Sequence, residues 1–88
     1  MIRETITVTN PKGIHARPSS MIVQTAGAAS SSITFTYQGV TVNAADIMGV
    51  LSLGAAHGAE IIVEVSGDDE AAAMARMKEI FALNFNDE

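Results

Sequence analysis

The sequence contains no cysteine and no tryptophan, and only two prolines. Without cysteine the chain can form neither a disulfide framework nor a thiolate metal site. No apolar run approaches the roughly 20 residues that a membrane-spanning helix needs. Residues 1–5 lack the basic-then-apolar order of a secretory signal peptide. These absences predict a cytoplasmic protein that does not insert into a membrane.

Basic residues are also scarce, since ten acids face five bases and give a net charge of −5. No lysine or arginine occurs between Pro18 and Ala75. A nucleic-acid binder needs a basic patch to neutralise phosphates, so we expect no nucleic-acid partner. Lys12 and Arg17 nevertheless flank His15 closely. They predict a small positive site on an acidic body, suited to one phosphoryl group rather than to a polyanion.

The chain length of 88 residues and the hydrophobic content of 48% fit one packed domain spanning residues 1–88. Alternation of apolar and polar residues predicts strands, and apolar positions three and four apart predict helices. Gly27 is a natural stop for the first helix. Hairpins mixed with helices imply an α+β fold, with one largely antiparallel sheet covered on one face. The expected βαββαβα order is strand 2–8, helix 18–27, strands 33–37 and 40–42, helix 47–53, strand 61–66 and a last helix that residues 67–70 open.

His15 precedes a helix start, because Pro18 fits the first turn of a helix, where its missing N–H is not needed. Unpaired backbone N–H groups and the positive end of the helix dipole favour an anion there. The same field disfavours imidazolium, so a ring nitrogen stays available to attack phosphorus. Arg17 opposes the dipole at a cost of about 0.3–1 kcal/mol. A guanidinium that donates two hydrogen bonds to the oxygens of a bound phosphate offsets this unfavourable interaction with the dipole.

These residues alone leave a second reading open, because a lone histidine in a loop is usually a surface or capping residue. A metal site is not expected, since the only other histidine is His57 and no carboxylate stands at ligand spacing from either ring. We read His57 as structural or incidental, placed after a short helix. No nucleotide-binding glycine-rich loop and no second acid or base near His15 are present, so neither a cofactor nor a self-contained enzyme is expected.

Two segments together resemble one known family. G-I-H-A-R-P-S-S at 13–20 resembles the active-site loop, and I-M-G-V-L-S-L-G-A-A-H-G-A at 47–59 resembles the short middle helix and its exit. The family is HPr, the histidine-containing phosphocarriers of the bacterial phosphoenolpyruvate-dependent sugar phosphotransferase system. The similarity extends over essentially the whole chain. It implies a two-layer open-faced sandwich, with a four-stranded antiparallel sheet covered on one face by three helices.

The resemblance also implies a function. His15 would accept a phosphoryl group on Nδ1 from phosphorylated enzyme I and pass it to the A domains of sugar-specific enzyme II permeases. Arg17 would be the charge partner, with the Ala16 N–H and Pro18 at the helix start. The chain would act as a monomeric co-substrate rather than as an enzyme. Two alternatives are a nitrogen-related phosphotransferase branch and a regulatory docking protein that needs no phosphate; a histidine at a helix start disfavours the latter.

The short helix at 47–53 carries too many apolar residues to bury them all. We assign Val50 and Leu53 to the core. Ile47, Met48 and Leu51 are expected to form an exposed docking patch. A methionine suits a surface that meets several partners. The resemblance agrees that this helix helps to bind enzyme I and the permease domains. The expected docking residues are Ser20, Ile47, Met48 and Leu51.

Position 46 departs from the family pattern. Many members carry a serine there that a dedicated kinase phosphorylates, whereas this chain has Asp46. Serine phosphorylation is therefore impossible at this position. Asp46 is either only an N-cap, worth about 1 kcal/mol, or a charge in the docking surface that imitates part of the effect of phosphoserine.

Overall fold

The computed structural model describes residues 1–86 of the chain. The expected element order is confirmed, and a single 3₁₀ turn follows the last helix. The strand limits agree with the sequence pattern to within about a residue. The elements are β1 (Ile2–Thr7), α1 (Ala16–Ala28), β2 (Ser32–Tyr37), β3 (Val40–Asn43), α2 (Ile47–Ser52), β4 (Glu60–Ser66), α3 (Glu70–Ala82) and the 3₁₀ turn Asn84–Asn86.

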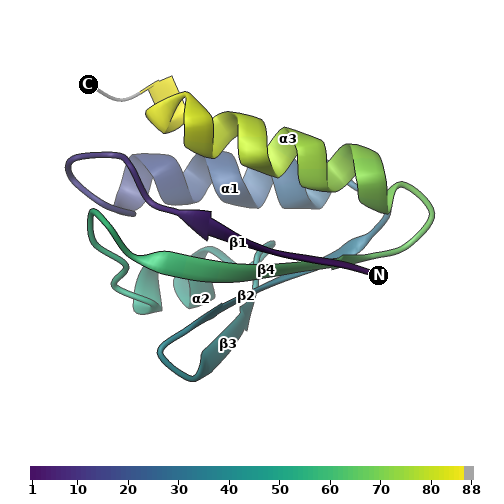
Figure 1. Ribbon diagram of the computed structural model, residues 1–88, viewed down its shortest axis with the longest axis horizontal. Coiled ribbons are helices and arrows are strands. Elements are labelled where there is room, and N and C mark those ends of the chain that lie inside the picture. The colour runs from purple at the N-terminus through teal and green to yellow at the C-terminus, as the bar shows by residue number, and fades with distance from the viewer. Residues whose placement is uncertain (87–88) are drawn as a thin grey trace.

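The four strands form one antiparallel sheet in the order β1-β4-β2-β3. Helices α1 and α3 lie side by side across one face of this sheet (Figure 1). The shorter α2 packs against α1 and β3. The expected two-layer open-faced sandwich is therefore confirmed.

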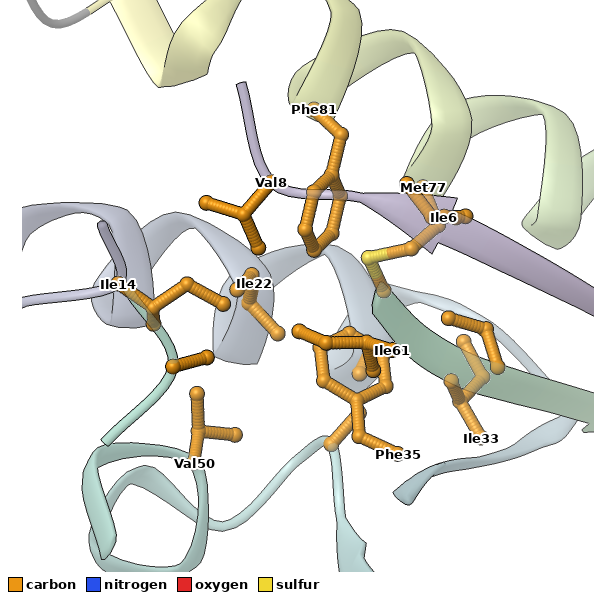
Figure 2. Close-up of a cluster of buried hydrophobic side chains, with 14 of the residues drawn as sticks. Ile6, Val8, Ile14, Ile22, Ile33, Phe35, Val50, Ile61, Met77 and Phe81 are labelled. Atoms are coloured by element: carbon orange, nitrogen blue, oxygen red, sulfur yellow. The ribbon is translucent and has the colours of Figure 1, made fainter. Parts of the chain in front are cut away.

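The core lies between the sheet and the two long helices. Every second residue of a strand points to the same face, so Ile61 and Phe35 point from the sheet toward Phe81 of α3 (Figure 2). Val50 of α2 and Ile14 extend this cluster, and both are buried. The residue that precedes His15 is thus anchored in the core.

The end of α1 corrects one expectation. Gly27 does not stop the helix, which continues to Ala28, and the capping residue Ala29 is extended. A tertiary contact positions the chain where the helix ends. The carboxylate of Asp69 accepts hydrogen bonds from the backbone N–H groups of Ser30 and Ser31, each at 2.9 Å. The chain is held there without a left-handed residue.

Candidate functional site

His15 occupies the position expected from the sequence. It is the N-cap residue of α1, with extended backbone angles, and its carbonyl accepts a hydrogen bond of 2.9 Å from the Ser19 N–H. Ala16 is the first helical residue and is exposed, while Pro18 is buried in the first turn. The His15 side chain is half-buried. The first N–H groups of a helix have no intrahelical acceptor, so the helix start favours an anion beside the imidazole.

A tight turn over Asn10-Pro11-Lys12-Gly13, a sequence typical of a break after a strand, presents His15. The Gly13 N–H donates to the Asn10 carbonyl at 3.0 Å. The buried Asn10 side chain in turn donates a hydrogen bond of 2.6 Å from Nδ2 to the Gly13 carbonyl. The Asn10-Pro11-Lys12-Gly13 sequence predicts this turn, but not the hydrogen bond by which the Asn10 side chain closes it.

The turn is also fastened to a distant segment. Gly13 has a φ of +70°, and a Cβ there would lie 2.7 Å from the Ala55 carbonyl oxygen. The Ile14 N–H donates to the same carbonyl at 2.9 Å. The chain on both sides of His15 is thus fixed, on one side by the loop after α2 and on the other by α1.

The charged side chains that lie near His15 in the sequence are basic. Arg17 and Lys12 are exposed, and neither makes an ion pair within residues 1–86. The first turn of α1 contains no acidic residue. By contrast, Lys78 bonds Glu4 at 2.8 Å elsewhere on the molecule. The helix start and these two cations form a region of positive potential that suits a phosphoryl group.

Helix α2 lies next to this region because it packs on α1. Asp46 is its N-cap and accepts a hydrogen bond of 3.2 Å from the Met48 N–H, as the capping interpretation predicts. Ile47 is 37% exposed and Met48 is 71% exposed. Leu51, which we expected to share their exposure, is half-buried. Ser20 on α1 is exposed, whereas Val50 is fully buried and Leu53 partly buried, as expected.

Other kinds of site are not found in the part of the chain that the structure describes. Its histidine and acidic side chains form no group of three that could hold a metal ion. No helix among these residues has the length and apolar character needed to span a bilayer.

Comparisons with known proteins agree with this geometry. A family model described as "PTS HPr component phosphorylation site" matches residues 2–82. The phosphocarrier protein HPr of Xylella fastidiosa (strain Temecula1) is 41% identical, over 100% of this chain and 99% of the relative. The crystal structure of HPr-C-His from Thermoanaerobacter tengcongensis superposes with a TM-score of 0.95 at 38% identity, covering 100% of this chain and 99% of that one. An HPr dimer from the same organism gives a TM-score of 0.77 at 38% identity, covering 97% and 98%.

Proposed function

Because the chain belongs to the HPr family of phosphotransferase-system phosphocarriers, we propose that His15 takes a phosphoryl group from phosphorylated enzyme I. It then passes the group to the A domains of sugar-specific enzyme II permeases. The observation that carries the proposal is the placement of His15 as the N-cap of a 13-residue helix whose first turn holds Arg17 and no acid.

The transfer is a substitution at phosphorus. Nδ1 of a neutral His15 attacks the phosphorus atom, and a new N–P bond forms while the bond between phosphorus and the donor group breaks. The electron pair of the broken bond stays with the donor, and the His15 ring keeps the proton on its other nitrogen. In transfer to a permease domain, a nucleophilic group of that domain attacks the phosphorus atom, the N–P bond to His15 breaks and its electron pair returns to Nδ1, so the carrier is regenerated unchanged.

The residues around His15 have separate roles in this proposal. The Arg17 guanidinium and the Ala16 N–H stabilise negative charge on the phosphoryl oxygens. Pro18 fixes the backbone of the first helical turn because its φ is already helical. The turn closed by Asn10 and Gly13 fixes the backbone that leads to His15, so little ordering of this backbone is required when a partner arrives.

The partner surface in this proposal joins Ser20 of α1 to the exposed apolar residues of α2. Ile47 and Met48 would make apolar contacts with enzyme I and with the permease domains, while His15 reaches the reacting phosphorus. His15 and Arg17 belong to one chain, so a single 88-residue domain, acting as a monomer, carries the whole site. The dimer described for the Thermoanaerobacter relative is a property of that protein.

Incubation with enzyme I and phosphoenolpyruvate, followed by intact mass measurement, tests the proposal. We expect the mass gain of one phosphoryl group, stable in alkali and labile in acid, as expected for a phosphoramidate. His15→Ala should gain none, whereas His57→Ala, which removes the other imidazole, should still be modified. A His15→Ala protein that is phosphorylated at the wild-type rate would overturn the assignment.

A further inference from the structure

The 3₁₀ turn Asn84–Asn86 is fastened to the segment that leads to His15. The Thr9 hydroxyl donates a hydrogen bond of 2.6 Å to Oδ1 of Asn84, across 75 positions of the chain. The turn also contacts both α1 and α3, and Figure 1 shows it at the end of the molecule where the loop after β1 enters α1. Thr9 directly precedes Asn10, whose side chain closes the turn before His15.

The backbone of this 3₁₀ turn is strained. Asn84 has a φ of 50° and Phe85 a φ of 58°, in the left-handed region that residues with a side chain rarely adopt. Asparagine tolerates this region because its short polar side chain can form local hydrogen bonds, whereas a phenylalanine there is an outlier. Two consecutive residues of this kind persist only where surrounding contacts hold them in place.

Phe85 supplies one of the contacts that hold the strained turn. Its side chain is 1% exposed, and its ring centroid lies 4.8 Å from that of Phe81 in an edge-to-face arrangement. The Phe81 ring lies 6.0 Å from that of Phe35 in the sheet. The turn is therefore anchored in the core, and Asn84 beside Phe85 offers Thr9 an acceptor of fixed position.

The bond between Thr9 and Asn84 is not needed to hold β1 in the sheet. The Val8 N–H donates to the Ala59 carbonyl and the Gly58 N–H donates to the Val8 carbonyl, each at 2.8 Å, so backbone pairing already fixes the chain at Val8. Thr9 is exposed, so its side chain gains little from burial. The bond acts instead on the chain that leaves the sheet at Thr9 and enters the turn before His15.

We propose that Thr9 and Asn84 are positioning residues for phosphoryl transfer, because their hydrogen bond sets where the turn before His15 begins. Substitution at phosphorus requires the attacking nitrogen to lie in line with the bond that breaks, with the reacting atoms about 3–3.5 Å apart. A displacement of about 1 Å can slow such a step about a hundredfold. The bond thus supports the transfer step and not the affinity for the donor. This inference rests on the proposed function, since it takes His15 as the acceptor.

The test measures transfer from phosphorylated enzyme I to the full chain by rapid quench, over a range of enzyme I concentrations. Thr9→Val removes the hydroxyl at nearly constant shape. It should lower the maximal rate about three- to thirtyfold and leave the half-saturating concentration of enzyme I unchanged. Thr9→Ser keeps the hydroxyl and should restore the maximal rate.

A second variant removes the other partner of the bond. Asn84→Gly tolerates the positive φ but lacks the acceptor oxygen, so it should slow transfer as Thr9→Val does. The double variant should be no slower than the slower single variant, because both substitutions remove the same bond.

Thr36→Val is the matched control. It also removes a threonine hydroxyl that bonds another side chain, that of Thr41 at 2.8 Å in the hairpin of β2 and β3, and it should transfer at the wild-type rate. Urea unfolding establishes that each variant is folded under the assay conditions. The inference is overturned by a wild-type maximal rate in Thr9→Val, by a change in the half-saturating concentration alone, by equal slowing in Thr36→Val, or by additive losses in the double variant.

The mass of the wild-type chain after incubation with enzyme I and phosphoenolpyruvate is measured in parallel. If that chain gains one phosphoryl group while Thr9→Val keeps its maximal rate, only the inference on Thr9 and Asn84 fails. If the wild-type chain gains none, the proposed function fails, and this inference fails with it.

Discussion

Gly13 lies so close to the Ala55 carbonyl that a Cβ on it would come within 2.7 Å of the oxygen. Two segments more than forty residues apart in the chain touch at this point, immediately before the proposed acceptor. The contact leaves no room for a side chain at position 13, and the φ of +70° would strain any residue that carries one. The local conformation at the acceptor turn thus depends on a tertiary contact.

We expect Gly13→Ala to lower the free energy of unfolding by about 2–4 kcal/mol, because backbone strain and crowding add. Phosphoryl transfer to His15 should slow as the turn shifts. Gly39→Ala is the matched control, since Gly39 has a φ of +81° and open space around it. That variant should lose only about 1 kcal/mol. If both variants lost the same free energy of unfolding in urea, the contact with Ala55 would add nothing to the cost of a side chain at position 13.

Arg17→Ala should slow transfer from enzyme I on the order of a hundredfold, because a positioned charge for the phosphoryl oxygens is lost. Stability should stay within about 0.5 kcal/mol of wild type or rise, since Arg17 opposes the dipole of α1 and makes no ion pair among the described residues. Arg17→Lys keeps the charge without the bidentate geometry and should be intermediate. Rapid-quench transfer assays and thermal unfolding check both parts; a large fall in melting temperature would contradict the assignment.

Acid should weaken the fold through Asp69. The Ser31 hydroxyl and the Ser30 backbone N–H donate to its carboxylate and lower its pKa below the ordinary value of 3.8. A carboxyl whose pKa is lower in the folded state adds stability above its unfolded pKa, and loses it as pH falls through the folded pKa. Asp69→Asn should therefore unfold at lower urea than wild type near neutral pH, and the difference should shrink on acidification.

Asp68→Asn serves as the control for that experiment, because Asp68 is exposed and accepts no hydrogen bond within residues 1–86. Its urea midpoint should follow that of wild type from about pH 7 to about pH 2, since an exposed, unpaired carboxylate adds little stability. If Asp69→Asn shows the same pH profile as wild type, the Asp69 carboxylate does not hold the start of β2.

Met48→Ala should weaken enzyme I binding by about tenfold, because a central apolar contact of an interface is worth more than about 1 kcal/mol. Its stability should change by less than about 0.5 kcal/mol, since the side chain is 71% exposed. Val50→Ala, two residues on and fully buried, should show the reverse, with about 1–3 kcal/mol lost on unfolding. Calorimetric titration and urea unfolding of both variants separate docking from folding.

Local signals were sufficient for most of the fold. Alternation in Ile33, Phe35 and Tyr37 marked a strand. Only Gln38 and Gly39 separate the two expected strands 33–37 and 40–42, and their φ values of 51° and 81° fit the turn of a hairpin. Pro18 placed His15 at a helix start without reference to the rest of the chain. Each of these conclusions depends on residues within one turn or one strand of each other.

The failures share a different cause. Gly27 was assigned as a helix stop from its residue type, but the Asp69 carboxylate fixes that end of the helix from far along the chain. The turn at residues 10–13 was expected, but its contact with the Ala55 carbonyl is not revealed by sequence spacing. Leu51 is half-buried on a short helix that packs on both α1 and β3, whereas Ile47 and Met48 of the same helix are exposed. Tertiary contacts decided all three.

Asp46→Ser should bind enzyme I more tightly than wild type. A carboxylate beside Ile47 and Met48 loses water when a partner covers them, and it repels an acidic partner surface, so both effects reduce affinity. Serine can keep the N-cap bond that Asp46 now accepts from the Met48 N–H at 3.2 Å, so stability should change little. Asp46→Asn, which removes the charge at nearly constant shape, should tighten binding equally.

The dependence of binding affinity on salt concentration distinguishes the two roles considered for Asp46, a helix cap and a charge in the docking surface. Raising the ionic strength should narrow the difference between Asp46→Ser and wild type, because the charge is exposed and therefore screened. Asp46→Ala should also lose about 1 kcal/mol of stability with the cap, while sharing the gain in affinity. Calorimetric titrations at low and high salt, with unfolding of each variant, give both quantities. Equal affinities of all four proteins at low salt would leave Asp46 as a helix cap alone, without the effect of a phosphoserine.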